Sequence, residues 1–241
     1  MRSLIERAAA ANCSTLVVTI DLQINGQRHC DMKNGLAVPP SLKLKNLIDM
    51  ARHPAWVASV LSGKRWTFGN LDGHLKVGKD VRSLAQWVGN QFDPALNWTD
   101  VEWIRSVWPR KLILKGILDT GDARRAAASG ADALIVSNHG GRQLDGAPSS
   151  ISALPKIADA VGGQIEVLFD GGIRSGQDVF RALALGAKAC LIGRAYIYGL
   201  GAAGEGGVAA AIDLIRKELD VTMALTGVNR VAEIGRDALA V

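Results

Sequence analysis

The amino-acid sequence predicts an α/β fold with a parallel sheet, and three observations support this prediction. Five short segments rich in aliphatic or β-branched residues each lead into a polar or glycine-rich stretch. Helical patterns follow the last four segments, at intervals of roughly 20 to 35 residues per βα unit. Glycine-rich turns follow the last two segments rather than the first, which favours a closed (β/α)8 barrel over a doubly wound open sheet.

The five expected strands have the short, nearly continuous apolar composition of strands that are buried on both faces. They are Thr15–Asp21, Lys111–Lys115, Ala133–Asn138, Ile165–Asp170 and Ala189–Ile192. A closed barrel of this type has eight strands. The sequence therefore predicts an incomplete (β/α)8 TIM barrel with about five of the eight βα units.

Helices are expected after the last four strands, at Thr120–Ser129, Ile151–Ala160, Gly176–Leu185 and Ala209–Leu219. The interval between Asp21 and Lys111 is too long for one crossover, so it must contain an insertion. Within it, Val81–Gln91 and Trp98–Val107 have helical patterns, whereas Cys30–Asp80 is expected to be irregular. We predict a single domain over residues 1–241 with a long basic loop insertion at about 30–80.

Composition indicates a globular protein with one large core, since 48% of the 241 residues are apolar and 21% are charged. No apolar run reaches the roughly 18 residues that a membrane span needs, and the first residues lack the apolar block of a signal peptide. The cytoplasm is the expected compartment. Cys13, Cys30 and Cys190 form no C-x-x-C pair, so we expect reduced core thiols and neither a disulfide nor a metal site.

The segment 33–82 is basic and aromatic. It carries nine Lys or Arg and three Asp or Glu, together with Trp56, Trp66 and Phe68. Such a segment can rest on an anionic lipid surface, although a solvated loop can have the same composition, and composition alone favours the loop. No feature indicates binding to nucleic acid.

Two glycine-containing turns, after the fourth and fifth expected strands, have features of a phosphate site. Glycines let backbone N–H groups approach an anion, a helix start adds partial positive charge, and arginine supplies two parallel donors. Either turn alone could be an ordinary tight βα turn, but two on neighbouring loops indicate a phosphate clamp. Gly199–Gly207 follows no strand directly, so we expect a flexible approach to the last helix. The candidate phosphate residues are Asp170, Gly171, Gly172, Arg174, Gly193 and Arg194.

An imidazole and a guanidinium follow the third expected strand on one short loop, as His139 and Arg142. Histidine can exchange a proton near neutral pH, and arginine can hold a carboxylate in a two-point grip. A lone histidine after a strand is more often structural. The flanking Gly-Gly and Arg favour a catalytic role for His139.

Lys115 and Asp21 end the first two strands, where a charge follows an apolar run. Burial of an unpaired charge is costly, so Lys115 is expected to face an anionic ligand. Asp21 could orient a nearby imidazole and stabilise its protonated form. Arg28 is a candidate second carboxylate anchor, although alone it is an ordinary loop arginine.

Three of these segments together resemble a known family. Leu112-Ile-Leu-Lys-Gly116, Ser137-Asn-His-Gly-Gly-Arg-Gln-Leu-Asp145 and Asp170-Gly-Gly-Ile-Arg-Ser-Gly176 are similar to the FMN-dependent 2-hydroxy-acid dehydrogenases and oxidases. This is the group of glycolate oxidase, L-lactate dehydrogenase and mandelate dehydrogenase. The likeness extends from Ser14 to Ala238, and the His-Gly-Gly-Arg block is its most specific part.

The resemblance implies a role for each candidate residue. His139 would be the active-site base, Asp21 would support it, and Arg142 and Arg28 would grip the substrate carboxylate. FMN would be the cofactor, with Lys115 beside the N1–O2 edge of the flavin and further flavin contacts from Thr19 and Ser137. The ribityl phosphate would be bound by Asp170, Gly171, Gly172, Arg174, Gly193 and Arg194.

The resemblance also implies a reaction and partners. An L-2-hydroxy acid of the lactate or mandelate type would be oxidised to the 2-oxo acid, and the electrons would pass to quinone, cytochrome or oxygen. A homo-oligomer is expected. In the lactate and mandelate dehydrogenase branch the loop after the fourth strand can bind the membrane, which makes a peripheral contact of residues 33–82 with the inner membrane face as well supported as a solvated loop.

Family members begin with further residues that form the first three barrel strands, so this chain is expected to hold strands four to eight. Two alternatives stay open. The first is a non-oxidative FMN barrel enzyme, against which a carboxylate-gripping Arg142 beside His139 argues. The second is an inactive barrel fragment that acts as a pairing or interaction module.

Overall fold

The computed structural model describes residues 1–24, 26, 28–35, 43–63 and 92–239. The chain divides into two compact units, of which the first comprises Met1–Leu22 and Ala95–Val241 and the second comprises Gln23–Pro94. The helix expected at Val81–Gln91, and parts 36–42 and 64–82 of the basic segment, lie outside the described residues. The single domain with an insertion at about 30–80 stays a prediction.

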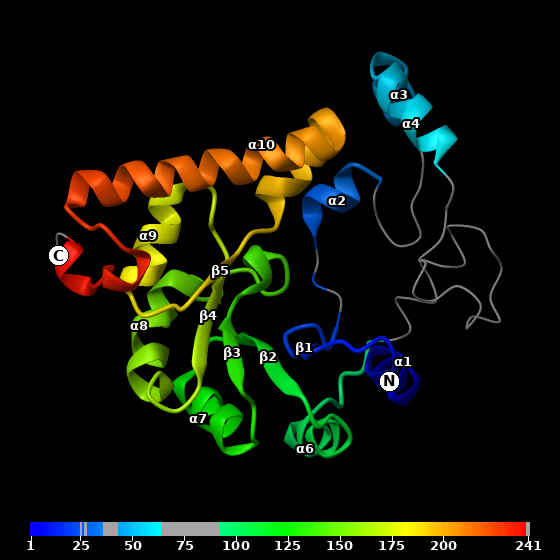
Figure 1. Ribbon diagram of the computed structural model, residues 1–241. Helices are drawn as coiled ribbons and strands as arrows, with labels where there is room; N and C mark the ends of the chain where they lie inside the picture. Colours follow the sequence, from blue (N-terminus) through cyan, green and yellow to red (C-terminus); the bar gives the residue numbers. More distant parts are fainter. Residues whose placement is uncertain (25, 27, 36–42, 64–91, 240–241) are drawn as a thin grey trace. The chain divides into compact units, whose positions relative to one another are not determined.

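All five expected strands form in the first unit, as one parallel sheet (Figure 1). They are β1 (Thr15–Thr19), β2 (Lys111–Ile117), β3 (Ala133–Val136), β4 (Glu166–Asp170) and β5 (Cys190–Leu191). Their order in the sheet is β1-β2-β3-β4-β5. A doubly wound sheet reverses its strand order at a switch point, whereas a barrel places each strand beside the previous one. The observed order therefore supports the barrel.

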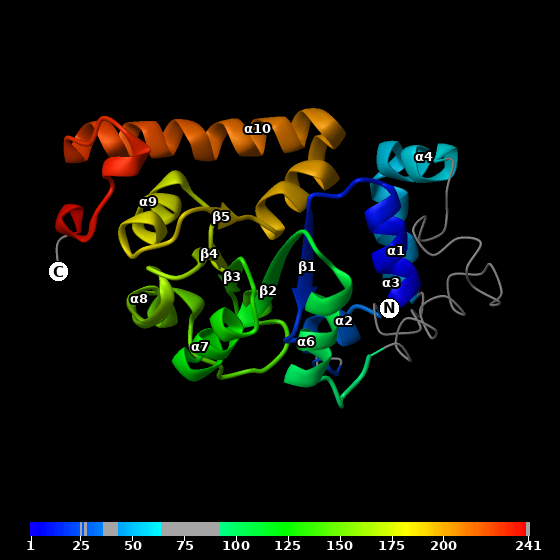
Figure 2. The same cartoon turned by 60° about the horizontal axis from the view of Figure 1, so that its bottom comes forward.

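Helices connect the strands and cover the sheet, as predicted. After α1 (Arg2–Ala10) and α6 (Trp98–Val107), the helices α7 (Thr120–Ala128), α8 (Ser150–Val161) and α9 (Gly176–Ala184) connect successive strands. Helices α7, α8 and α9 pack against the sheet, and α10 (Arg194–Thr226) packs against α9 (Figures 1 and 2). Short 3₁₀ helices lie at His139–Gly141, Val231–Glu233 and Arg236–Ala238. The core contains the fully buried Trp108, Leu112, Leu114, Leu134, Val136, Ile157 and Phe169.

The glycine-rich segment Gly199–Gly207 leads into the long last stretch of α10, and it contains a kink between two helical stretches. The helix bends within this segment, where Ala203 and Gly204 have non-helical backbone angles. A Cβ atom on Gly199 would lie 2.3 Å from the carbonyl oxygen of Gly207, and one on Gly207 would lie 2.0 Å from that of Gly199. The two glycines therefore allow the two limbs of the bend to touch through their backbones.

The three cysteines are free, as predicted, but the prediction that all three are core residues is wrong for two of them. Cys13 lies in the exposed turn after α1, and Cys30 is exposed on the short helix α2 (His29–Lys33). Cys190 packs against the core from β5, and its burial raises the pKa of the thiol to about 12. At neutral pH this thiol is therefore protonated and a poor nucleophile.

The second unit contains helices where the sequence was expected to be irregular. In addition to α2, the structure forms α3 (Leu44–Arg52) and α4 (Pro54–Ser62). The backbone N–H of Lys43 donates to Asn46 Oδ1 at 2.9 Å and so starts α3, while Pro54 has a fixed φ suited to the first position of α4. In the described part of the chain, no helix combines the length and the apolar character that a membrane span requires.

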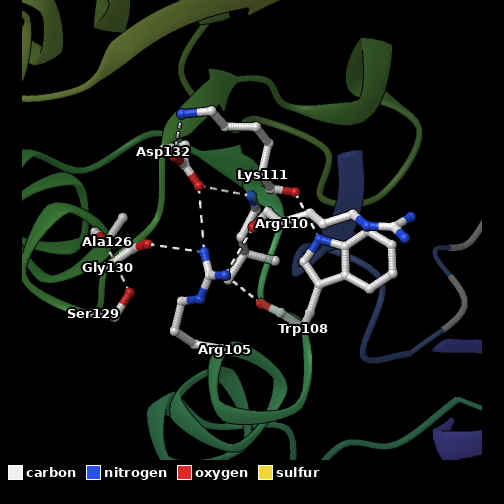
Figure 3. A network of polar contacts seen from close by, with 9 residues as sticks. Arg105, Trp108, Arg110, Lys111, Ala126, Ser129, Gly130 and Asp132 are labelled. Carbon is white, nitrogen blue, oxygen red and sulfur yellow. Dashed lines mark hydrogen bonds and ion pairs between the residues drawn. The ribbon is translucent and has the colours of Figure 1, made fainter. Parts of the chain in front are cut away.

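A polar network lies at the amino ends of β2 and β3, away from their carboxyl ends (Figure 3). Asp132 accepts from the Lys111 ammonium group at 2.7 Å, from the Leu112 backbone N–H at 2.9 Å and from Arg105 Nη1 at 3.3 Å. The hydrogen bond from Lys111, followed by that from the Leu112 N–H, lowers the pKa of the Asp132 carboxyl group. The same contact with Asp132 raises the pKa of Lys111.

The network also joins segments that are distant in the sequence. The Arg105 guanidinium donates to the carbonyl oxygens of Trp108 and Arg110, and Arg110 Nη1 donates to the Cys13 carbonyl oxygen at 2.6 Å. Contacts at the amino ends of barrel strands serve stability, because the active sites of barrel enzymes lie at the carboxyl ends. The network therefore fixes α6 and the turn after α1 to the start of the sheet.

Candidate functional site

Candidate residues from four strands lie at one edge of the sheet. Thr19 ends β1 and is in register with Lys115 of β2, Ser137 directly follows β3, and Asp170 ends β4. Because the strands are parallel, these residues lie toward the carboxyl ends, where barrel enzymes place their active sites. Gly193 follows β5 at the same edge. The structure thus brings the predicted residues of the first unit together.

A mostly buried ion pair lies at this edge. The Lys115 ammonium nitrogen is 2.7 Å from Asp170 Oδ2, and it donates to Ser137 Oγ at 3.0 Å. Ser137 is fully buried, and its hydroxyl donates to the same Asp170 oxygen at 2.7 Å. Asp170 is therefore an anionic partner of the kind that Lys115 requires. Lysine has three N–H donors, so its two contacts with described residues leave a third donor for a ligand.

His139 is held in an unusual backbone conformation. Its φ is +56°, and among the described residues Asn12 is the one other non-glycine residue with a positive φ. The backbone N–H of His139 donates to Ser137 Oγ at 3.0 Å. A left-handed conformation of this kind costs on the order of 1–3 kcal/mol and persists where surrounding contacts enforce it, often at functional sites. The strain therefore supports a functional role for this loop.

The imidazole ring of His139 is oriented by Asp21. Its Nδ1 lies 3.3 Å from Asp21 Oδ1, and both side chains are mostly buried. A carboxylate at this distance favours the N–H on Nδ1, which leaves Nε2 as the proton acceptor. The other oxygen, Asp21 Oδ2, is buried without a hydrogen-bond partner among the described residues. An unsatisfied buried oxygen is costly, so it marks a place for a donor from a ligand or a water molecule.

Gln143 is a site residue that the sequence reasoning missed. Its Nε2 donates to the Asp21 carbonyl oxygen at 3.2 Å and so ties the loop after β3 to the end of β1. Its place beside Arg142 in the same motif is the signal that could have found it. Arg142 is partly buried on this loop. Arg28 belongs to the second unit, where it precedes α2, and its role as a carboxylate anchor stays a prediction.

The turn after β4 has the backbone freedom of a phosphate site. Gly171 and Gly172 have φ values of +118° and +81°, and a Cβ atom on Gly172 would meet no atom within 4 Å. The side chain of Arg174 is exposed beside them. In the turn after β5, Gly193 likewise has open space beside it, and Arg194 Nη2 donates to the Gly140 carbonyl oxygen at 3.1 Å.

The start of α9 differs from the expected phosphate site. Asp178 Oδ2 accepts from the backbone N–H groups of Arg174 and Ser175, each at 3.0 Å. Glu218 Oε2 accepts from the Gly176 N–H at 2.8 Å. These carboxylates occupy the N–H groups that were expected to face an anion. A bound phosphate would therefore depend on the glycine turns and the arginine side chains.

Comparison with known protein families identifies the family of this chain. The model of the family described as FMN-dependent dehydrogenase matches residues 1–241. The chain belongs to the FMN-dependent dehydrogenase family.

Solved structures of mandelate-oxidising enzymes are similar to this family member. The crystal structure of (S)-mandelate dehydrogenase, described as a monotopic membrane protein, is 36% identical with a TM-score of 0.91, and the match covers 99% of this chain and 63% of that chain. A mandelate oxidase mutant with (S)-mandelic acid is 37% identical with a TM-score of 0.73, over 97% of this chain and 57% of that chain. The chain thus spans less than two thirds of the length of these relatives, and its fold is the predicted partial (β/α)8 barrel.

The residues at the carboxyl edge fit the cofactor of this family. Lys115 has an N–H donor for the electron-rich edge of a flavin. Gly172 and Gly193 leave space beside the backbone for a phosphate, and Arg174 and Arg194 are exposed guanidinium groups that suit its charge. The donor set therefore matches the two chemically different ends of FMN.

Proposed function

We propose that the protein, with FMN bound, oxidises an L-2-hydroxy acid to the 2-oxo acid and that His139 is the base. The observation that carries the proposal is the contact between His139 Nδ1 and Asp21 at the carboxyl edge of the sheet. This arrangement leaves Nε2 to accept a proton, and the family supplies a flavin that can accept electrons.

In the proposed reaction, different residues of the chain have different roles. His139 takes up a proton at Nε2, and the Asp21 carboxylate stabilises the imidazolium that results. Arg142 holds the substrate carboxylate through parallel N–H donors. FMN, when bound, supplies the two-electron acceptor. Lys115 contributes positive charge to the cofactor site, where Asp170 and Ser137 fix its position.

The same base and arginines serve a hydride route and a carbanion route, so both are compatible with the proposed site. Relatives named for mandelate support a substrate of the mandelate or lactate type. Quinone, cytochrome or oxygen is the proposed electron acceptor, and a homo-oligomer is the proposed assembly. The cytoplasmic side of the membrane is the proposed location.

The test is a spectroscopic titration of the purified 241-residue chain with FMN, followed by anaerobic addition of (S)-mandelate or L-lactate. We expect the absorption band of bound oxidised flavin to form and then to bleach with one of the two acids. D-enantiomers are the control. A chain that binds no flavin would instead support the inactive interaction module, and bound flavin that neither acid bleaches would contradict the proposed substrate class.

We also propose that the second unit contacts the membrane surface through α3 and α4. Leu44, Leu47 and Ile48 form an exposed apolar face on α3, and Trp56 and Leu61 are exposed on α4. Lys43, Lys45 and Arg52 lie on or beside α3. Helices with exposed apolar and basic side chains bind anionic bilayer surfaces. The relative described as a monotopic membrane protein supports this proposal.

Co-sedimentation with vesicles tests the membrane contact. We expect the protein to bind vesicles that contain phosphatidylglycerol more strongly than vesicles of phosphatidylcholine alone, and salt should weaken this binding. Leu61→Glu should lower the bound fraction, whereas Leu214→Glu, at an exposed apolar position on α10, is the matched control. Equal losses in both variants would remove α4 from the contact.

A further inference from the structure

We propose that Gly116 is a positioning residue for the reaction, because it makes room for Asp21 and so sets the carboxylate that orients His139. This inference rests on the proposed function, in which His139 is the base. It concerns a residue of β2 that makes no contact with His139 in the described interactions and that carries no chemistry of its own.

Gly116 lies at an irregularity of the sheet beside the candidate site. The register between β2 and β3 shifts between Lys115 and Ile117, so one extra residue is accommodated there. Leu112, Leu114 and Ile117 are buried, which shows that the alternation of buried positions moves by one residue across the shift. Bulges beside active sites commonly re-aim side chains. Gly116 is the residue at which the register moves.

The local geometry of Gly116 admits no side chain. Its φ is +111°, which residues with a Cβ atom rarely adopt. A Cβ atom there would lie 2.6 Å from Asp21 Cγ, 2.7 Å from Asp21 Cβ and 2.9 Å from Asp21 Oδ1. All three atoms belong to one side chain, and Oδ1 is the atom that contacts His139 Nδ1. The space beside Gly116 is therefore filled by the part of Asp21 that faces the base.

The Asp21 side chain has little freedom to move away from a Cβ atom at position 116. Gln143 donates to the Asp21 carbonyl oxygen, and Asp21 Oδ2 is buried. The preceding residue, Ile20, donates its backbone N–H to the Lys115 carbonyl oxygen at 2.8 Å. A methyl group at position 116 would thus displace the carboxylate from the imidazole rather than pass beside it. A displacement of about 1 Å at a positioned catalytic group can lower turnover on the order of 100-fold.

The test compares Gly116→Ala with Gly186→Ala. Gly186 has a similar φ of +108°, and a Cβ atom on it would lie 2.7 Å from Ala158 Cβ, on helix α8. The control therefore reproduces the backbone strain and the steric clash away from His139. The readout is the tautomer of the His139 ring, measured through its ¹⁵N chemical shifts in the 241-residue chain and assigned with a His139→Gln variant.

We expect Gly116→Ala to lose the Nδ1–H form of His139, as Asp21→Asn should, whereas Gly186→Ala should retain the wild-type tautomer with a similar loss of stability. Retention of the wild-type tautomer in folded Gly116→Ala would overturn the proposal. This readout needs neither flavin nor substrate, so the proposal can fail or hold independently of the flavin titration. In an active holoenzyme, Gly116→Ala should lower kcat far more than it changes KM.

A second variant decides the case in which Gly116→Ala does not fold. Combining it with Asp21→Gly removes the three atoms that a Cβ atom at position 116 would meet. We expect this double variant to fold with the stability of Asp21→Gly alone, apart from the cost of the backbone strain. A double variant that also fails to fold would show that the bulge itself requires glycine, and it would overturn the positioning role.

Discussion

His139 and Arg174 follow different strands of the same sheet edge and serve different parts of the proposed reaction. His139 is mostly buried against Asp21, which suits proton transfer, and Arg174 is exposed near Gly172, which has open space beside it, so that Arg174 suits anion binding. Substitutions at the two positions should therefore separate turnover from cofactor binding.

We predict that His139→Gln lowers turnover by about 100- to 10,000-fold, because the amide cannot accept the proton that a general base removes. FMN binding should stay close to that of the wild type. Steady-state rates with (S)-mandelate or L-lactate, together with the flavin content of the purified variant, measure both effects. An unchanged rate would remove His139 from the reaction.

Arg174→Ala should have the opposite effect, since the phosphate loses a charge-assisted donor. We expect a higher dissociation constant for FMN, measured by fluorescence titration, and near-normal turnover once the flavin is saturating. Arg181→Ala, at an exposed position on α9, is the control. Full flavin retention in Arg174→Ala would place the phosphate elsewhere.

The difference between predicted and missed site residues has a physical basis. His139 and Arg142 carry their chemistry within one short motif, so the sequence alone indicates them. Gln143 contributes by a hydrogen bond to Asp21, which is 122 positions away, and its amide has no distinctive chemistry. The space that Gly116 leaves for Asp21 is likewise a tertiary property, which no local pattern reveals.

At the scale of elements, the amino ends of the strands are fixed by charge as well as by apolar packing. Asp132 receives hydrogen bonds from the first two residues of β2 and from α6, and it lies just before β3. The carboxylate therefore joins two strands and a helix on the side opposite the candidate site.

We predict that Asp132→Asn lowers the free energy of unfolding at pH 7 by about 1–3 kcal/mol, because charge-assisted hydrogen bonds are weakened. The pKa of Asp132 is lowered from 3.8 by folding, so its carboxylate contributes stability above that pH. The contribution is lost as the pH falls through the lower folded-state pKa. Denaturant unfolding at a series of pH values should show the difference between variant and wild type shrinking at acid pH.

Asp159→Asn provides the comparison for this measurement. Asp159 pairs with Arg236 at an exposed site, where an ion pair contributes about 1 kcal/mol or less. If both variants lower the free energy of unfolding equally, the network around Asp132 contributes no more stability than an ordinary surface ion pair.

Elements were predictable where a long apolar pattern repeats and less so elsewhere. The five strands and the helices between them follow such patterns, and their bounds shift by only a few residues. Helices α3 and α4 are short, and their apolar residues are exposed rather than packed on a core. The abundance of Pro, Gly and Lys around them therefore concealed helices that start at Leu44 and Pro54.

At the scale of the whole first unit, the sheet has two edges. In the described residues β1 pairs with β2 and β5 pairs with β4, so each has one side without a strand partner. Val17 on β1 is 47% exposed. Edges of this kind promote association, and a charged residue on an edge strand opposes it.

We predict that the 241-residue chain self-associates and that Val17→Lys reduces this association, because the lysine disfavours pairing at β1. Sedimentation velocity at matched concentrations measures the change. Leu214→Lys places the same charge on an exposed face of α10 and should leave association unaltered. If both variants reduced association equally, the added positive charge, and not its position at the sheet edge, would control self-association.

The hydroxyl of Ser137 joins the two halves of the candidate site. It contacts Lys115 and Asp170 on one side and accepts the His139 backbone N–H on the other. Lys115, which we propose lies beside the flavin, and the loop that carries the proposed base His139 therefore share one oxygen atom as a hydrogen-bond partner. As a result, a shift of the Lys115 ammonium group toward a bound cofactor would reach the backbone of His139 through the Ser137 hydroxyl alone.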